Sequence, residues 1–456
     1  MNFSSLRVAA KPTVTLILIL AMVASYLAAA RHKLYLDDMK PVSASVATRP
    51  FSDATQVSIS AAEAPEASNS QATHVAEGTS VKVYEAHSDA EFSMFALTWK
   101  DPKGTNPQVN VHVRGLQSNG SWGAWYDADT LTPTGETPTK GTDLLYVHPT
   151  KAVQISFDST SAPLNDLSDL EMVFIDGKTQ KVIAPASYST TEQLRLIPRA
   201  AWGADENLRC QQPTYDNRVT ALTIHHTVGA NDYSVDAAPG IVRGIYVYHA
   251  QTLGWCDIGY QSLVDRFGNI YEGTYGGFDK AVQGAHAGGF NQNTWAISMM
   301  GDFRTVAPSN EMIAAVGNLA GWKAFISGFD PLGTSVHYSE GSSYTSIPKG
   351  QAVTVHNIFG HRDVDTTECP GDAAYAQLDN IRNLASARYR AMQTGAATTA
   401  LNIVAAPTAP DPLGNLAGQI GPILGGAVIV LVILFALGVF GSTSANKDQT
   451  TTTAAA

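Results

Sequence analysis

Residues 360–371 read GHRDVDTTECPG, and they place His361 and Cys369 close together in a chain that contains only three cysteines. The other two, Cys210 and Cys256, lie more than a hundred residues upstream. More than half of the twelve histidines fall between His225 and His361. A lone thiol beside a histidine, in a histidine-rich half of the chain, indicates metal or acid–base chemistry.

Length and charge limit the classes of function. At 456 residues the chain can form two domains plus tails, and 44% hydrophobic residues are enough for real cores. The net charge is −11, and no run rich in lysine or arginine occurs outside the extreme N-terminus. This acidic balance argues against nucleic acid as a partner.

Two apolar segments predict contact with a membrane. Residues 12–30 (PTVTLILILAMVASYLAAA) are uncharged and follow Arg7 and Lys11, so residues 1–30 are a signal peptide or an uncleaved signal anchor. Residues 420–440 (IGPILGGAVIVLVILFALGVF) are also uncharged and predict a transmembrane helix, with a short tail at 441–456. The part between them is expected outside the cytoplasm.

Composition divides the exported part into segments. Residues 31–77 are rich in Ala, Ser, Thr, Pro and Glu and predict a disordered spacer. Residues 78–186 alternate apolar and polar side chains in short runs such as EFSMFALTW and QVNVHVRGL, which predicts an all-β, sandwich-like domain. Within it, Trp122 and Trp125 fit either an aromatic sugar-binding surface or packing at a sheet edge.

Residues 190–395 mix strand and helix patterns and predict an α/β domain, a central mixed β-sheet flanked by helices, followed by a linker at 396–419. If VTALTIHH forms a strand, Leu222, Ile224 and His226 share one face. Thr223 and His225 share the other face. Because the apolar face belongs to the core, His225 is the histidine expected at a site.

Four segments occur in order and resemble one known family: TIHHTVGAND (223–232), GWCDIGYQSLVDRFGNIYEG (254–273), GAHAGGFNQNTWAISMMGDF (284–303) and the opening GHRDVDTTECPG. Together they closely resemble the type 2 N-acetylmuramoyl-L-alanine amidase domain, which also occurs in peptidoglycan recognition proteins and a phage lysozyme. The resemblance covers about residues 197–389 and leaves the β-rich domain unassigned.

The resemblance implies a zinc site. Its Zn²⁺ ligands would be His225, His361 and Cys369, and three protein ligands leave a fourth position for water, as in catalytic zinc sites. Tyr260 would lie beside the metal, where it and Thr367 could donate hydrogen bonds to a developing oxyanion. Thr367 stands where the phage enzyme has a lysine, so that positive charge is missing.

The same resemblance places His249 and His286 in segments that line the substrate groove, where each is either a substrate contact or a structural histidine. Cys210 and Cys256 remain as the natural disulfide pair in an oxidising compartment. The sequence therefore predicts a zinc-dependent amidase that cleaves the bond between N-acetylmuramic acid and L-alanine in peptidoglycan. It would be anchored to the membrane of a bacterial cell envelope, with its catalytic domain on the extracytoplasmic side.

Two alternatives stay open. One is a non-catalytic module that binds peptidoglycan, although family members that only bind typically lack the cysteine ligand. The other makes the β-rich domain the functional part, as an adhesin or an envelope scaffold.

Overall fold

A computed structural model of the chain describes residues 40–65, 80–101, 107–131, 137, 139–158, 161–163, 167–181, 194–397 and 402–403. The predicted signal segment at 1–30 and the predicted transmembrane helix at 420–440 lie outside these residues. Within them, the structure contains no helix with the length and apolar character needed to cross a membrane.

The first domain, here the β domain (residues 45–176), is all-β as predicted, with every strand pair antiparallel. Its backbone hydrogen bonds join one continuous eight-stranded sheet in the order β1-β8-β3-β7-β4-β5, in which β2 and β6 also pair with β3. Phe95, Val153 and Phe174 lie in its buried core. The strands are β1 (Ser45–Pro50), β2 (Thr55–Ser60), β3 (Ser80–Lys100), β4 (Val111–Gly115), β5 (Tyr126–Ala128), β6 (Thr139–Gly141), β7 (Leu145–Phe157) and β8 (Ser168–Asp176).

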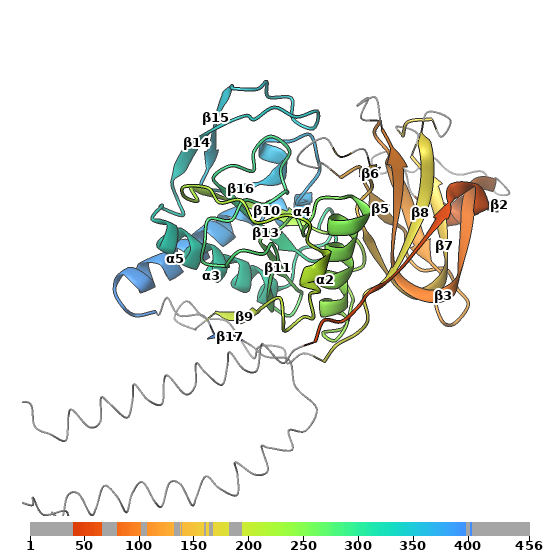
Figure 1. The fold of residues 1–456 in the computed structure, drawn as a ribbon, viewed down its shortest axis with the longest axis horizontal. Coiled ribbons are helices and arrows are strands. Elements are labelled where there is room, and N and C mark those ends of the chain that lie inside the picture. The colour runs from red at the N-terminus through yellow and green to blue at the C-terminus, as the bar shows by residue number, and fades with distance from the viewer. Residues whose placement is uncertain are drawn as a thin grey trace, which may run out of the picture. The chain divides into compact units, whose positions relative to one another are not determined.

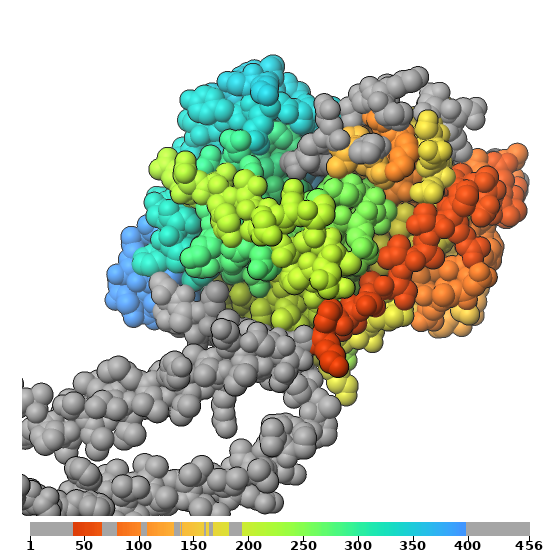
Figure 2. Space-filling view, viewed as in Figure 1, coloured from red at the N-terminus to blue at the C-terminus, as the bar shows by residue number. Residues whose placement is uncertain are grey.

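The prediction of a disordered spacer over residues 31–77 is wrong for residues 45–63. There β1 pairs with β8, and β2 pairs with β3. Between the two strands, the short helix η1 (Phe51–Asp53) buries Phe51 against Tyr84 and Phe157. The segment is polar because it lies on the surface of the β domain, where Figure 2 shows it in red. Backbone pairing and a single aromatic anchor order it, and composition does not reveal either.

Trp122 and Trp125 pack around a buried arginine. The guanidinium of Arg114 lies 4.5 Å from the ring centroid of Trp125 and 5.6 Å from that of Trp122. The indole N–H of Trp125 donates to the carbonyl oxygen of Glu63, at 2.7 Å, in the helix η2 (Ala61–Glu63). This arrangement favours the packing interpretation of the two tryptophans.

The second domain, here the α/β domain (residues 195–403), has the predicted central mixed sheet flanked by helices (Figure 1). Its strand order is β16-β10-β13-β11-β12-β9-β17, with one antiparallel pair, β11 and β12, among parallel ones. These strands are β9 (Arg195–Ile197), β10 (Ala221–His226), β11 (Ser262–Val264), β12 (Ile270–Glu272), β13 (Thr294–Met299), β16 (Ile358–Gly360) and β17 (Asn402–Ile403). Strand β17 falls inside the predicted linker 396–419, so that part of the linker prediction is wrong.

Helices cover both faces of this sheet. The face that carries Leu222 and Ile224 packs against helices α3 (Asn310–Ser327) and α5 (Leu378–Gln393). The other face packs against α2 (Ala238–Val247), which continues into a π-helical turn η5 (Tyr248–Thr252). A two-stranded hairpin of β14 (Thr334–Tyr338) and β15 (Ala352–His356), and the short helices η4 (Glu206–Leu208), η6 (His361–Asp363) and α4 (Asp372–Tyr375), complete the domain.

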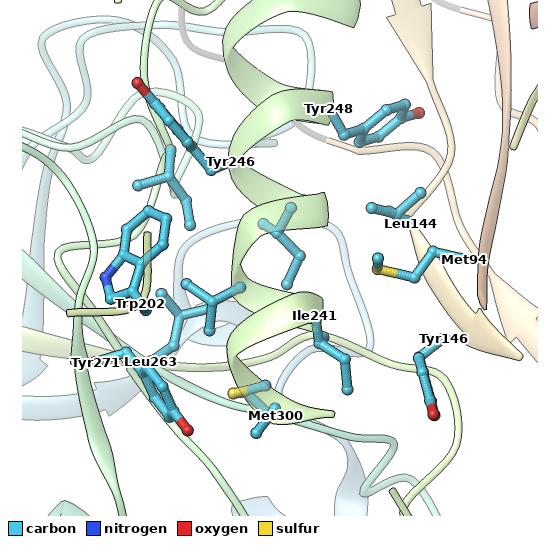
Figure 3. Close-up of a cluster of buried hydrophobic side chains, with 14 of the residues drawn as sticks. Met94, Leu144, Tyr146, Trp202, Ile241, Tyr246, Tyr248, Leu263, Tyr271 and Met300 are labelled. Atoms are coloured by element: carbon cyan, nitrogen blue, oxygen red, sulfur yellow. The ribbon is translucent and has the colours of Figure 1, made fainter. Parts of the chain in front are cut away.

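Helix α2 also joins the two domains. Figure 3 shows Met94, Leu144 and Tyr146 of the β domain on one side of α2, and Trp202 and Tyr271 on the other. The backbones approach closely, because a Cβ added at Gly240 would lie 2.2 Å from the carbonyl oxygen of Lys178. The two domains therefore share one buried core.

Candidate metal centre

Two of the predicted ligands lie at the same end of neighbouring parallel strands. His225 is the next-to-last residue of β10, and His361 directly follows β16. The register pairs Ile224 with Gly360, so the next residue on each strand is a histidine. Their ring centroids are 4.4 Å apart. As predicted from the alternation, Leu222 and Ile224 point to the opposite, apolar face.

Cys369 reaches the same place from the loop after η6. The backbone N–H of Arg362 donates to the carbonyl oxygen of Cys369 at 3.0 Å, which closes this loop. The next turn needs Gly371, whose φ is +87° and where a Cβ would lie 2.3 Å from the carbonyl carbon of Phe303. One ligand atom each from His225, His361 and Cys369 lies within 4.8 Å of the others.

His225 and His361 each make a polar contact through Nε2. Nε2 of His225 lies 3.0 Å from Nδ1 of His286, and Nε2 of His361 lies 2.8 Å from a carboxylate oxygen of Asp365. Nδ1 of His225 faces the sulfur of Cys369 at 3.6 Å. Partners of this kind fix the ring orientation of metal-binding histidines. Asp365 was not predicted; its signal was an aspartate four residues after the histidine of the opening motif.

The donor set fits zinc. Burial lowers the pKa of His225 well below its usual range, so the ring is neutral and has a lone pair to give. Burial raises the pKa of the Cys369 thiol, and the N–H of His226 opposes this by donating to the sulfur at 3.3 Å. A bound cation removes the thiol proton. Two imidazoles and one thiolate are ligands that zinc prefers, with an open position left over.

Tyr260 and Thr367, predicted beside the metal, line the same pocket as His361 and Cys369. The ring centroid of Tyr260 lies 5.3 Å from that of His225. Burial raises the pKa of the Tyr260 phenol well above its usual range, so the hydroxyl keeps its proton as a donor. The hydroxyl oxygen of Thr367 accepts a hydrogen bond from the N–H of Cys369 at 3.1 Å.

The two histidines predicted to lie in segments along the groove, His249 and His286, are buried. His286 is 4% exposed; it contacts His225 and borders the metal pocket. His249 is 3% exposed, packs against the ring of Trp255 at 4.4 Å, and accepts a hydrogen bond from the N–H of Gly259. Burial lowers the pKa of each to about 3, so both are neutral. Both histidines therefore make structural contacts within the protein.

A larger groove continues from the metal pocket. It offers about 460 Å³ and shares Trp255 and Ala285 with the metal pocket. The predicted disulfide between Cys210 and Cys256 is confirmed, and Cys256 lies in the groove wall. Other lining residues are polar and aromatic, among them Arg209, Asp257, Tyr275, Asn291 and Glu340.

The β domain forms another wall of the metal pocket, which the sequence did not predict. Four residues from two of its segments line it: Asp129, Thr130, Leu131 and Asp143. The pocket offers only about 40 Å³ to water molecules, so it is narrow beside the groove. The metal centre therefore lies where the two domains meet.

Comparison with known proteins agrees with the resemblance seen in the sequence. The N-acetylmuramoyl-L-alanine amidase family matches residues 215–372, which include all three candidate ligands. Peptidoglycan-recognition protein SC2 of Drosophila melanogaster is 30% identical over 188 residues, which are 41% of this chain and 86% of that relative. The chain belongs to this family of amidases and peptidoglycan-recognition proteins.

Other members of the amidase and peptidoglycan-recognition family match the same region. Peptidoglycan recognition protein 1 of Mus musculus is 28% identical over 186 residues, 41% of this chain and 86% of that relative. The solved structure of wild-type Drosophila PGRP-LB is 29% identical, with a TM-score of 0.32, and the match covers 41% of this chain and 93% of that one. Residues 47–185 match a separate family described as Rv3811 N-terminal galactose-binding domain-like. That match begins within β1 and includes β2.

Proposed function

We propose that the protein hydrolyses the amide bond between N-acetylmuramic acid and L-alanine in peptidoglycan, with zinc as its metal. The observation that carries this proposal is the complete trio of His225, His361 and Cys369, whose ligand atoms lie within 4.8 Å of one another. Tyr260 and Thr367 line the pocket beside them. A module that only binds has no need of three converging ligands with an open position, whereas a catalytic zinc site does.

The residues around the three ligands have separate roles in this proposal. When bound, zinc supplies Lewis-acid polarisation of the substrate carbonyl and activation of a water molecule. Tyr260, a neutral donor that lines the pocket, would donate a hydrogen bond to the charge that develops on the carbonyl oxygen. His286 and Asp365 hold the two histidine rings in place. Thr367 orients the backbone N–H of Cys369.

The groove next to the metal pocket would hold the stem peptide and glycan. Its volume of about 460 Å³, and its mixture of charged, amide and aromatic side chains, suit a polar peptide joined to a sugar. The curated relatives are peptidoglycan-recognition proteins by name, which supports peptidoglycan as the ligand.

We also infer that the chain acts outside the cytoplasm of a bacterium and is held at its membrane. The disulfide between Cys210 and Cys256 suits an oxidising compartment, which is also where peptidoglycan lies. The predicted transmembrane helix at 420–440 would be the anchor. Protease added to intact cells should digest the two domains while sparing a tag placed after Ala456; protection of both would contradict this topology.

Replacing Cys369 with alanine distinguishes an amidase from a binding module. The variant loses one of three ligands, so zinc content and amide hydrolysis should both fall to background. The groove is built from other residues, so binding of a soluble muropeptide should persist. The assay counts new L-alanine amino groups released from purified peptidoglycan. If the zinc-loaded wild-type protein binds muropeptide and releases none, the protein is a binding module.

A further inference from the structure

The β-domain wall of the metal pocket carries two carboxyl groups. Asp129 follows β5 and Asp143 precedes β7, and both line the pocket that contains Tyr260, His361 and Cys369. Both residues are half-buried. They are the acidic groups of the described chain that share this pocket with the ligands.

Hydrogen bonds fix the two aspartates against each other. The N–H of Asp129 donates to a carboxylate oxygen of Asp143 at 3.1 Å, and the N–H of Asp143 donates to the carbonyl oxygen of Asp129 at 2.9 Å. The hydroxyl of Tyr248, in η5 of the α/β domain, donates to the carbonyl oxygen of Thr142 at 2.8 Å. The segment that carries Asp143 is therefore held directly by the domain that carries the ligands.

The surroundings favour a proton on this pair. Burial and, after it, the neighbouring charge of Asp129 together raise the pKa of Asp143 to about 8. Arg304, the nearby cation, is engaged in ion pairs with Asp127 and Asp302. In the described part of the chain, no lysine or arginine forms an ion pair with Asp129 or Asp143. Asp129, Asp302 and Arg304 act on Asp143, and Asp143 acts on Tyr248, Tyr260 and Cys369. His226, His286 and His361 line the same pocket.

Amide hydrolysis needs a group that moves a proton from the attacking water to the leaving nitrogen. Tyr260 cannot accept that proton, because its pKa lies far above neutral and it is already protonated. His286 is engaged with His225, and His226, which also lines the pocket, accepts a hydrogen bond from the N–H of Phe303 at 3.3 Å. Thr367 carries no ionisable group. The α/β domain therefore leaves the proton-transfer role open within the pocket.

We propose that Asp143 of the β domain is this proton carrier, with Asp129 positioning it, an inference that rests on the proposed amidase function. The Asp143 carboxylate takes one proton from the water whose oxygen forms the new bond to the carbonyl carbon. The resulting neutral carboxyl gives that proton to the nitrogen as the carbon–nitrogen bond breaks. A carboxylic acid and a free amine leave, and Asp143 returns to its starting form. The β domain is then part of the catalytic unit.

The test compares four variants of the full-length, zinc-loaded protein. Asp143→Asn should lower kcat about 10²- to 10⁴-fold, the usual contribution of general acid–base catalysis, with zinc content and muropeptide binding unchanged. Asp143→Glu should recover part of the loss, and Asp129→Asn should have a smaller effect. Asp169→Asn makes the same chemical change on the exposed surface of the β domain and serves as the control.

Two further readouts separate chemistry from structure. The kcat of the wild type should rise with pH through an ionisation that Asp143→Asn lacks. Infrared difference spectra should show a neutral carboxyl band that titrates in the wild type and is absent from Asp143→Asn. Turnover of Asp143→Asn equal to that of Asp169→Asn would overturn the assignment. If Asp143→Asn does not fold, Asp143→Glu takes its place, and a kcat–pH profile whose apparent pKa differs from that of the titrating carboxyl band in the same variant would overturn the assignment. No amine release by the wild type would remove the amidase proposal itself, whereas full wild-type turnover by Asp143→Asn would remove only this inference.

Discussion

Replacing Asp365 with asparagine tests whether the hydrogen bond between Asp365 and His361 strengthens zinc binding. The side chain of Asp365 is fully buried, and its carboxylate accepts the N–H of His361 Nε2 at 2.8 Å. Asparagine has nearly the same shape and can still accept through its amide oxygen, but it removes the negative charge that makes the imidazole a stronger ligand. Loss of such a partner typically costs 10- to 100-fold in metal affinity, or about 1.4–2.8 kcal/mol.

The assay is competition for zinc between the purified protein and a chelating dye at fixed pH. Asp279→Asn makes the same substitution at an exposed surface pair with Lys280 and should leave zinc affinity unchanged. Muropeptide binding should stay the same in both variants, because the groove is intact. If Asp365→Asn binds zinc as tightly as Asp279→Asn does, Asp365 does not strengthen zinc binding.

Three further predictions concern stability. Phe51→Ala should lower the free energy of unfolding by about 3 kcal/mol in urea denaturation, because this aromatic anchor is only 8% exposed; an unchanged value would restore the disordered-spacer prediction. Removing the disulfide with Cys210→Ala and Cys256→Ala should cost about 4 kcal/mol from loop entropy, given a separation of 46 residues, and an unchanged melting temperature would argue against this. Burial lowers the pKa of Lys323 to about 7 from 10.5, so the unfolded chain binds more protons across that window and the free energy of unfolding rises with pH there. In Lys323→Met this rise between pH 7 and 9 should shrink, and an identical slope in both proteins would contradict the assignment.

Sequence patterns predicted the features of the fold that depend on residues close together in the chain. Alternation along TIHH separated His225 from the apolar face of β10, and the structure places Leu222 and Ile224 in the core as expected. The mixture of strand and helix periods predicted the mixed sheet. The disulfide followed from cysteine counting together with the resemblance to a family with a cysteine ligand.

Features that depend on distant partners could not be predicted. The strands β1 and β2 carry too few apolar residues to stand out, and their order comes from pairing with β8 and β3. Asp143 precedes His225 by more than eighty residues, and nothing around it in the sequence indicates that it faces a metal pocket. Its position results from packing of the β domain on α2, which depends on close backbone contacts such as that between Gly177 and Gly240.

The proposed function requires zinc, held by His225, His361 and Cys369, for cleavage of the muramoyl–L-alanine amide. Its most direct test is mass spectrometry of the products that the purified full-length protein releases from peptidoglycan, after zinc removal and again after zinc is restored. We expect free stem peptides that begin with an unmodified L-alanine, absent from the metal-free sample and regained with zinc. Stem peptides that stay attached to the glycan in the zinc-loaded sample, despite one bound zinc per chain, would contradict it.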